Sequence, residues 1–179
     1  MKKVIFLDRD GTLNIDKGYT HLIKDYKLFD GVIEALDTLS KRGYTFVIMT
    51  NQSGIGRGYF TEDDFFKFIN HMIVDFKKNN IDIEAFYFSP YHEKNGIGKY
   101  KKKDASRKPD CGMYDAYVKE YGDFSFENSW SIGDSLRDLQ ATKKFNKEIK
   151  SILISLKKID DADIDYSVQS FLEVLNIIK

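Results

Sequence analysis

The sequence predicts an α/β protein built on a doubly wound parallel sheet with Rossmann-like layering. Short apolar runs recur along the chain, each followed by polar turn residues and then by a longer segment of helical period. This is the pattern of parallel strands joined by crossover helices. The chain of 179 residues contains no internal repeat, low-complexity linker or break in composition. We therefore expect one domain over residues 1–179.

The predicted elements follow one another in the order of such a fold. Thr61, followed by three acids, is a favourable helix start, because its hydroxyl can cap free N–H groups and acids favour the positive end of the helix dipole. Strands are predicted at Val4–Leu7, Thr45–Met49, Ala85–Phe88, Trp130–Ile132 and Ser151–Ile154. Helices are predicted at Val32–Lys41, Glu62–Lys78, Gly112–Tyr121 and Leu136–Phe145, with a last one near Phe171–Ile178. The stretches too long for plain turns are Asn14–Asp30, Gln52–Phe60 and Ser89–Arg107.

Composition excludes several classes of protein. The 28 Lys and Arg residues balance 28 Asp and Glu residues, so the chain lacks the overall positive charge of a nucleic-acid binder, and 15% aromatic residues exclude a disordered chain. The single cysteine cannot form an intramolecular disulfide, which favours a reducing compartment. The apolar run Val4–Leu7 is too short for a signal-peptide core or a membrane span. We expect a cytoplasmic monomer with no nucleic-acid or membrane partner.

Acidic side chains follow two of the predicted strands. The first strand ends in Asp8 and Asp10, with Gly11 for a tight turn, and the fourth ends in Asp134, with Asp138 one helical turn further on. Ligands of a doubly wound sheet bind beyond the carboxyl ends of its strands, where these side chains would converge. Carboxylate oxygens are the ligands that Mg²⁺ prefers. The pattern favours a magnesium site over an ordinary turn rich in Asp and Gly.

Two other segments supply groups that suit a phosphoryl ligand. Thr50–Gly58 follows the second strand with a hydroxyl, two amides and glycines that would let backbone N–H groups approach an anion. Arg107–Pro109 adds two cations next to a rigid residue. Acids, a hydroxyl and a lysine at separate strand ends of one sheet suit Mg²⁺ together with a phosphoryl group.

These motifs resemble those of the haloacid dehalogenase-like (HAD) phosphatases. The four family motifs occur here in order: Asp-x-Asp-Gly-Thr at residues 8–12, Thr50, Lys108, and Gly-Asp-x-x-x-Asp at residues 133–138. The longer matches at residues 6–14, 50–58 and 107–109 resemble the branch that contains D-glycero-D-manno-heptose 1,7-bisphosphate phosphatase and histidinol phosphatase. The resemblance covers about the whole chain to Ile154.

The resemblance implies a Mg²⁺-dependent phosphatase that hydrolyses a small phosphorylated sugar through an aspartyl-phosphate. Asp8 would be the nucleophile, and Asp10 the general acid and then the base. Mg²⁺ would be held by the Asp8 carboxylate, the Asp10 backbone carbonyl and Asp134, while Thr50 and Lys108 would hold the phosphoryl oxygens. The role of Asp138 is open. It would either orient Lys108 or a metal-bound water, or be an ordinary exposed acid on a helix.

The expected substrate is D-glycero-D-manno-heptose 1,7-bisphosphate, converted to the 1-phosphate, with histidinol phosphate as the alternative. The intervals between the motifs leave no room for the cap domain of other family members, so the long loops would select the substrate. Arg57 and Arg107 are the candidates for binding a second phosphate or the sugar hydroxyls, because a guanidinium engages such oxygens as a fork. The other candidates for substrate contacts are Thr12, Asn51, Gln52 and Ser53.

The loop before Arg107 departs from the branch. Many relatives carry Cys-x-His, a spacer and Cys-x-Cys there, which is a structural zinc pattern. The corresponding places in this chain hold Ser89, Tyr91, Asp104 and Ser106, with His92 and Cys111 beside such places but not on them. Zinc is therefore not expected. The same loop is rich in lysine, which favours a solvated surface or the steering of an anionic substrate over a nucleic-acid site.

Two hypotheses from other functional classes compete with the phosphatase hypothesis. A phospho-accepting signalling domain also places an Asp, a Thr and a Lys at the strand ends of a doubly wound sheet. Asp10, two residues after Asp8, argues against it because it supplies a hydrolytic base. A catalytically dead scaffold is disfavoured because no core catalytic position is substituted.

Overall fold

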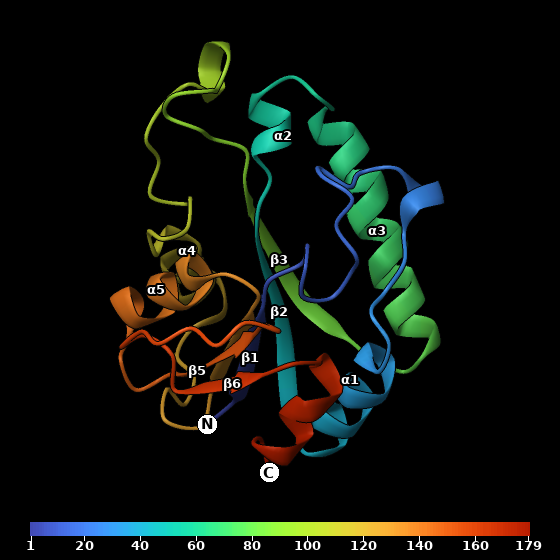
Figure 1. Ribbon diagram of the computed structural model, residues 1–179, viewed down its shortest axis with the longest axis vertical. Helices are drawn as coiled ribbons and strands as arrows, with labels where there is room; N and C mark the ends of the chain where they lie inside the picture. The colour runs from blue at the N-terminus through green and yellow to red at the C-terminus, as the bar shows by residue number, and fades with distance from the viewer.

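A six-stranded, all-parallel sheet forms the centre of the computed structural model, which describes residues 1–179 (Figure 1). Its strand order is β3-β2-β1-β4-β5-β6. The order reverses at β1, which has β2 on one side and β4 on the other, and the crevice at such a switch point is where doubly wound sheets bind ligands. The strands are β1 (Lys3–Leu7), β2 (Tyr44–Asn51), β3 (Ile83–Ser89), β4 (Trp130–Gly133), β5 (Lys150–Ile154) and β6 (Tyr166–Val168).

Helices cover both faces of the sheet, as Figure 1 shows. Successive side chains of β1 point to opposite faces: Ile5 and Leu7 belong to one buried cluster, while Val4 and Phe6 belong to another. The first cluster contains α1, α3 and η3, and the second contains α4 and α5. The α-helices are α1 (Val32–Lys41), α2 (Ser53–Gly56), α3 (Glu62–Lys78), α4 (Gly112–Tyr121) and α5 (Leu136–Phe145). The 3₁₀ helices are η1 (Ile23–Asp25), η2 (Gly98–Tyr100) and η3 (Phe171–Asn176).

The predicted doubly wound fold is confirmed, and the helices α1, α3, α4 and α5 have the predicted bounds. The five predicted strands are also present, each slightly longer than expected. At the start of α3 the Thr61 hydroxyl accepts a hydrogen bond from the Asp64 N–H at 3.1 Å, and the Asp64 carboxylate accepts one from the Thr61 N–H at 3.0 Å. This capping box is the reason that the long helix begins where its acids predict.

The structure differs from the local predictions in three places. The last helix is a 3₁₀ helix over Phe171–Asn176, in which Phe171 and Val174 lie three residues apart and are both buried, so a three-residue period fits this packing. β6 was not expected, because Val168 is its one buried residue and a single apolar side chain makes no strand pattern. The stretch Gln52–Phe60 is not all loop, since it contains α2.

Neither interval between the motifs holds an inserted domain. Between β1 and α1 the chain forms a loop with η1, and between β3 and α4 it forms a loop with η2. Both loops lie beyond the carboxyl ends of the central strands, which places them as walls of the crevice (Figure 1).

None of the helices has the length and apolar character needed to cross a membrane.

Candidate active site

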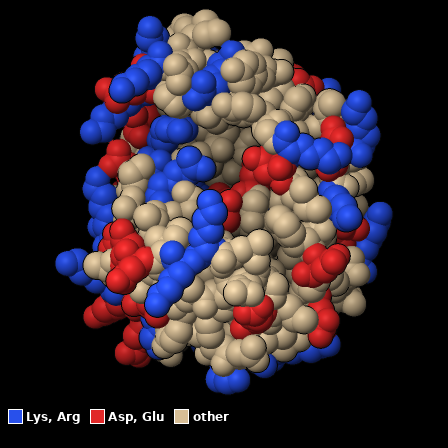
Figure 2. All heavy atoms as spheres, viewed as in Figure 1, with Lys and Arg blue, Asp and Glu red and all other residues tan.

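A polar cavity of about 360 Å³ opens at the carboxyl ends of β1, β2 and β4. Of the 15 residues that line it, only one is hydrophobic. Figure 2 shows the hollow, with Lys and Arg atoms along one side and Asp and Glu atoms on the other. The sequence-predicted residues that line the cavity are Asp8, Asp10, Thr50, Asn51, Gln52, Ser53, Arg57, Arg107 and Asp134.

Three carboxylates meet where β1 and β4 end. Asp8, Asp134 and Asp138 each bring one oxygen into a group whose members all lie within 4.8 Å of one another. Burial raises the pKa of Asp8 to about 8, although the Lys108 ammonium acts to lower it, and the other two carboxylates add to the rise. Partial burial, followed by the Asp138 carboxylate, raises the pKa of Asp134 to about 6. Oxygen ligands crowded in this way suit a hard cation such as Mg²⁺.

Gly11 allows the two strand ends to approach each other. It has a φ of +84°, and a Cβ built on it would lie 2.1 Å from an oxygen of Asp134. Any other residue would therefore both strain the turn and displace Asp134. The glycines of α2 serve packing, because a Cβ on Gly54 would lie 2.2 Å from the ring of Phe60 and one on Gly56 would lie 2.2 Å from the Pro90 carbonyl oxygen.

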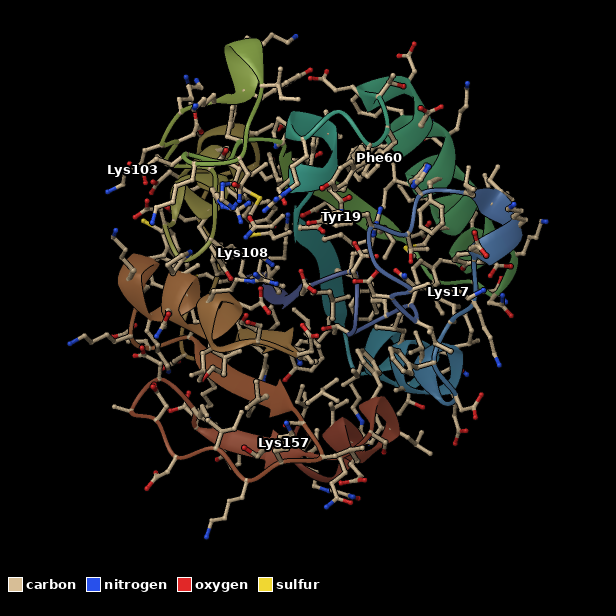
Figure 3. The ribbon with its side chains drawn as sticks, turned by 45° about the horizontal axis from the view of Figure 1, so that its top comes forward. Lys17, Tyr19, Phe60, Lys103, Lys108 and Lys157 are labelled. Atoms are coloured by element: carbon tan, nitrogen blue, oxygen red, sulfur yellow. The ribbon has the colours of Figure 1, made fainter.

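Lys108, labelled in Figure 3, is buried and does not itself line the cavity. Its Nζ lies 2.7 Å from Asp8 Oδ1, 2.7 Å from Asp138 Oδ1 and 2.6 Å from the Met49 carbonyl oxygen. Burial acts to lower the pKa of Lys108, but the Asp138 and Asp8 carboxylates outweigh it and hold that pKa above its ordinary value. The lysine therefore carries a positive charge directly beside the candidate nucleophile.

Asp138 is not an exposed helix acid, so that interpretation is wrong. Its side chain is only 5% exposed, and besides pairing with Lys108 it accepts a hydrogen bond from the Ser135 N–H at 3.1 Å. The first of these contacts orients Lys108, and the second caps the start of α5. Sequence alone placed Asp138 on the first turn of a helix, but its burial depends on the lysine that packs against it.

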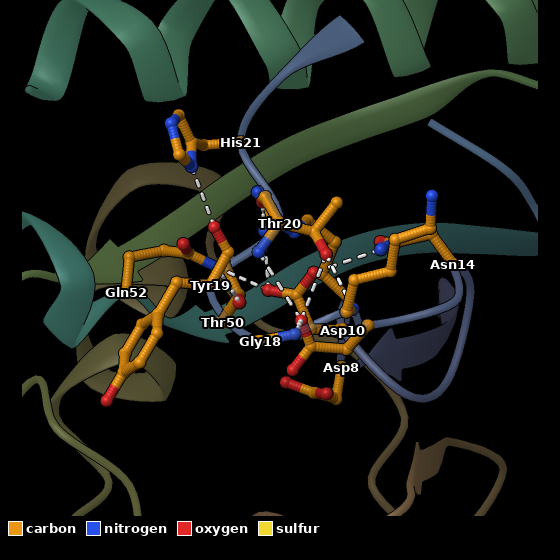
Figure 4. Close-up of polar contacts among 12 residues, drawn as sticks. Asp8, Asp10, Asn14, Gly18, Tyr19, Thr20, His21, Thr50 and Gln52 are labelled. Atoms are coloured by element: carbon orange, nitrogen blue, oxygen red, sulfur yellow. Dashed lines mark hydrogen bonds and ion pairs between the residues drawn. The ribbon is translucent and has the colours of Figure 1, made fainter. Parts of the chain in front are cut away.

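Asp10 is held by three donors (Figure 4). Its Oδ2 accepts from Arg9 Nη2 at 2.5 Å and from Gln52 Nε2 at 2.8 Å, and its Oδ1 accepts from Asn14 Nδ2 at 3.0 Å. Gln52 Nε2 also lies 2.8 Å from the Thr50 hydroxyl. The amide of Gln52 thus ties the candidate acid to the candidate phosphoryl-binding threonine.

The side chain of Asn51 is hydrogen-bonded to the backbone of Lys108. It donates to the Lys108 carbonyl oxygen at 3.0 Å and accepts from the Lys108 N–H at 3.1 Å.

Thr12 does not line the cavity. It is buried, and its hydroxyl has no hydrogen-bond partner. It borders a separate cavity of about 200 Å³ beside Phe29 and Phe171.

Three arginines line the cavity together with the carboxylates. Arg57 and Arg107 were predicted, whereas Arg137 was not, although its place three residues after Asp134 on the first turn of α5 is a signal that could have found it. None of the three forms an ion pair with Asp or Glu. Burial, then the charges of Arg137 and Arg57, lower the pKa of Arg107, so an anion bound here would relieve this repulsion. The other lining residues that were not predicted are Asp16, Gly18, Tyr19, Gly54 and His92.

Three of the four places of the zinc pattern are joined by hydrogen bonds between their own side chains, and the fourth is linked to them through Lys102. The Ser106 hydroxyl lies 3.0 Å from the Ser89 hydroxyl and 2.7 Å from Asp104 Oδ1. Lys102 links Asp104 to Tyr91, because its Nζ lies 2.8 Å from Asp104 Oδ2 and 4.1 Å from the centre of the Tyr91 ring. The backbone carbonyl oxygen of Tyr91 in turn accepts a hydrogen bond from Arg107 Nη1 at 3.1 Å, which links this network to the cavity wall.

Several known proteins are similar in sequence to this chain. The model of the polynucleotide kinase 3 phosphatase family matches residues 3–169. The chain is 39% identical to the D-glycero-beta-D-manno-heptose-1,7-bisphosphate 7-phosphatase of Haemophilus influenzae, over 100% of this chain and 98% of that protein. It is 37% identical to the D-glycero-alpha-D-manno-heptose-1,7-bisphosphate 7-phosphatase of Campylobacter jejuni, over 99% and 96%.

Solved structures show the same similarity. The D,D-heptose 1,7-bisphosphate phosphatase from B. bronchiseptica, complexed with magnesium and phosphate, superposes with a TM-score of 0.80 at 25% identity, covering 98% of this chain and 97% of that one. A HAD-like phosphatase from Mesorhizobium loti superposes with a TM-score of 0.86 at 26% identity, covering 99% and 84%.

Proposed function

The chain belongs to the polynucleotide kinase 3 phosphatase family of HAD-like phosphatases, and we propose that it removes the 7-phosphate from D-glycero-D-manno-heptose 1,7-bisphosphate in a Mg²⁺-dependent reaction. One observation carries the choice of substrate. Arg57, Arg107 and Arg137 line the same cavity as the carboxylates that would act on the transferred phosphoryl group, and none of the three forms an ion pair with Asp or Glu. A substrate with a second phosphate supplies the missing anion.

The reaction follows from the placement of the side chains. The Asp8 carboxylate attacks phosphorus, the bond from phosphorus to the sugar oxygen breaks, and Asp10 gives that oxygen a proton. Water then attacks the aspartyl-phosphate, Asp10 takes its proton, and inorganic phosphate leaves with Asp8 restored. Lys108 and Thr50 hold phosphoryl oxygens in both steps.

Asp8 and Asp134, together with the Asp10 backbone carbonyl, would hold Mg²⁺. The carboxylates fit this ion because their oxygens are hard ligands, already grouped within 4.8 Å, whose mutual repulsion a cation relieves. When bound, Mg²⁺ supplies positive charge that neutralises the phosphoryl oxygens. Asp138 acts on the reaction by orienting Lys108, whose Nζ lies 2.7 Å from Asp138 Oδ1.

Histidinol phosphate fits the cavity less well. That substrate has a single phosphate and an ammonium group, so its cationic end would face three arginines. A signalling domain is disfavoured as well, because Asp10 lines the same cavity as Asp8 and would hydrolyse the aspartyl-phosphate.

Phosphate release across a panel of esters tests the proposal. The panel comprises both anomers of the heptose bisphosphate, the heptose 7-phosphate, histidinol phosphate and an oligonucleotide with a 3′-phosphate, with Asp8→Asn protein as the blank. We expect the highest kcat/KM for a heptose bisphosphate, only in the presence of Mg²⁺. A higher value for histidinol phosphate or for the oligonucleotide would replace the proposed substrate.

A further inference from the structure

Arg9 stands between the two catalytic aspartates in the sequence and is completely buried. Its guanidinium carbon lies 4.7 Å from the centre of the Phe68 ring and 5.6 Å from that of Phe65. Burying a charged side chain beside two aromatic rings, directly after β1, costs free energy unless the charge is paired. The mechanism described above does not use Arg9.

Stability does not explain Arg9. Its Nε and Nη1 atoms are buried and have no hydrogen-bond partner, and unsatisfied buried donors cost free energy. An apolar side chain of similar volume would pack against Phe65 and Phe68 without that cost, as is often found when a buried charged group is replaced. The contacts that Arg9 does make therefore point to its role.

Both contacts come from one nitrogen. Arg9 Nη2 donates to Asp10 Oδ2 at 2.5 Å and to the Thr20 carbonyl oxygen at 2.8 Å. Asp10 is otherwise held only by the neutral amides of Gln52 and Asn14, so Arg9 is its one charged donor (Figure 4). Charge-assisted hydrogen bonds are the stronger and more directional kind.

The second contact reaches the wall of the cavity. Thr20 follows Tyr19, which lines the cavity, packs against Tyr59 with ring centres 4.8 Å apart, and lies 5.9 Å from the Arg57 guanidinium. Arg9 therefore joins the proton-transferring carboxylate to the loop segment that faces the substrate. A shift of that loop would therefore change the position of the Asp10 carboxylate through the Arg9 side chain.

We propose that Arg9 is a positioning residue, which holds the Asp10 carboxylate in the orientation for proton transfer and fixes the loop at Thr20 relative to it. The proposal rests on the proposed function, in which Asp10 protonates the departing sugar oxygen. Its test compares two kinds of substrate. A sugar phosphate has a leaving group that needs the proton, and 4-nitrophenyl phosphate has one that departs without it.

Arg9→Met removes both contacts while preserving volume. We expect a melting temperature equal to or above that of the wild type, and kcat lower by about tenfold to a hundredfold for the sugar phosphate but by much less for 4-nitrophenyl phosphate. Arg9→Lys keeps the charge and should restore part of the loss; it also carries the test if the methionine variant does not fold. Equal slowing of the two substrates by both variants would overturn the proposal.

A matched control and a double variant make the result specific. Arg42 donates to the backbone carbonyls of Leu175 and Ile178, away from the cavity, so Arg42→Met should not change the ratio of the two rates. In an Asp10→Asn background, Arg9→Met should cause no further loss of kcat for the sugar phosphate. A further loss by the same factor would show that Arg9 does not act through Asp10, while the proposed function stands. If Asp10→Asn itself slows both substrates equally, the acid role fails, and the positioning role fails with it.

Discussion

The ammonium of Lys108 lies 2.7 Å from Oδ1 of Asp138, and both side chains are buried. The same ammonium contacts the candidate nucleophile Asp8 at 2.7 Å, so Asp138 sets the place from which Lys108 acts on the reaction. The pair thus links the first turn of α5 to the end of β1.

Removing the charge of Asp138 should reduce both activity and stability. In Asp138→Asn the single amide oxygen cannot accept from both Lys108 and the Ser135 N–H, while Lys108 keeps Asp8 as a partner, so we expect the free energy of unfolding to fall by about 1 to 3 kcal/mol. The lysine loses its second anchor, and we expect kcat to fall by about tenfold or more. Chemical denaturation and steady-state kinetics on the same preparation check both values. A large loss of stability with unchanged kcat would contradict this role.

The arginine cluster should carry selectivity for a second phosphate. Arg57→Ala, Arg107→Ala or Arg137→Ala should lower kcat/KM for the bisphosphate more than for the matching monophosphate. A lost charged contact in a partly wet site is worth about 1.5 to 3 kcal/mol, or roughly tenfold to a hundredfold in the ratio of the two values. Arg42→Ala serves as the control outside the cavity. If each of the three variants lowers kcat/KM for the bisphosphate and for the monophosphate by the same factor, the three arginines do not bind the second phosphate.

Protons should compete with Mg²⁺ for the carboxylates. The pKa of Asp134 is raised to about 6 and that of Asp8 to about 8, so in the metal-free protein both groups contribute stability at low pH that is lost as pH rises through these values. Mg²⁺ binds the ionised form and should offset that loss. We therefore expect Mg²⁺ to raise the melting temperature more at pH 8 than at pH 5. An equal or larger effect at pH 5 would contradict the assignment of these ligands.

Purified protein should contain no stoichiometric zinc. The side chains of Ser89, Asp104 and Ser106 are joined by hydrogen bonds, Tyr91 lies against Lys102, and none of the four residues is a cysteine or histidine. Elemental analysis of protein purified without chelators decides the point, with a zinc-bearing relative as the positive control. One tightly bound zinc per chain would show that His92, Cys111 or nearby acids form a site.

The sequence predicted the parts of the fold that depend on repeated apolar residues. α3 has a full amphipathic face and a capping box, and its bounds were predictable, whereas β6 has only Val168 to mark it. The convergence of Asp8 and Asp134 was predictable too, because parallel strands end at one edge of the sheet.

The sequence could not predict contacts that depend on packing between distant segments. The burial of Asp138 depends on Lys108, and the burial of Arg9 depends on Phe65 and Phe68 of α3. Arg137 reaches the cavity only because α5 begins at its rim. The single domain, the monomeric state, the cytoplasmic location and the absence of nucleic-acid and membrane partners stay predictions.

The most direct test of the proposed activity is a phosphorus NMR time course of D-glycero-D-manno-heptose 1,7-bisphosphate with the enzyme and Mg²⁺. We predict that the resonance of the 7-phosphate disappears as inorganic phosphate appears, while the anomeric phosphate remains on the sugar, and that Asp8→Asn protein leaves the spectrum unchanged. Loss of the anomeric phosphate instead, or no turnover of either anomer by folded protein, would contradict the proposed activity.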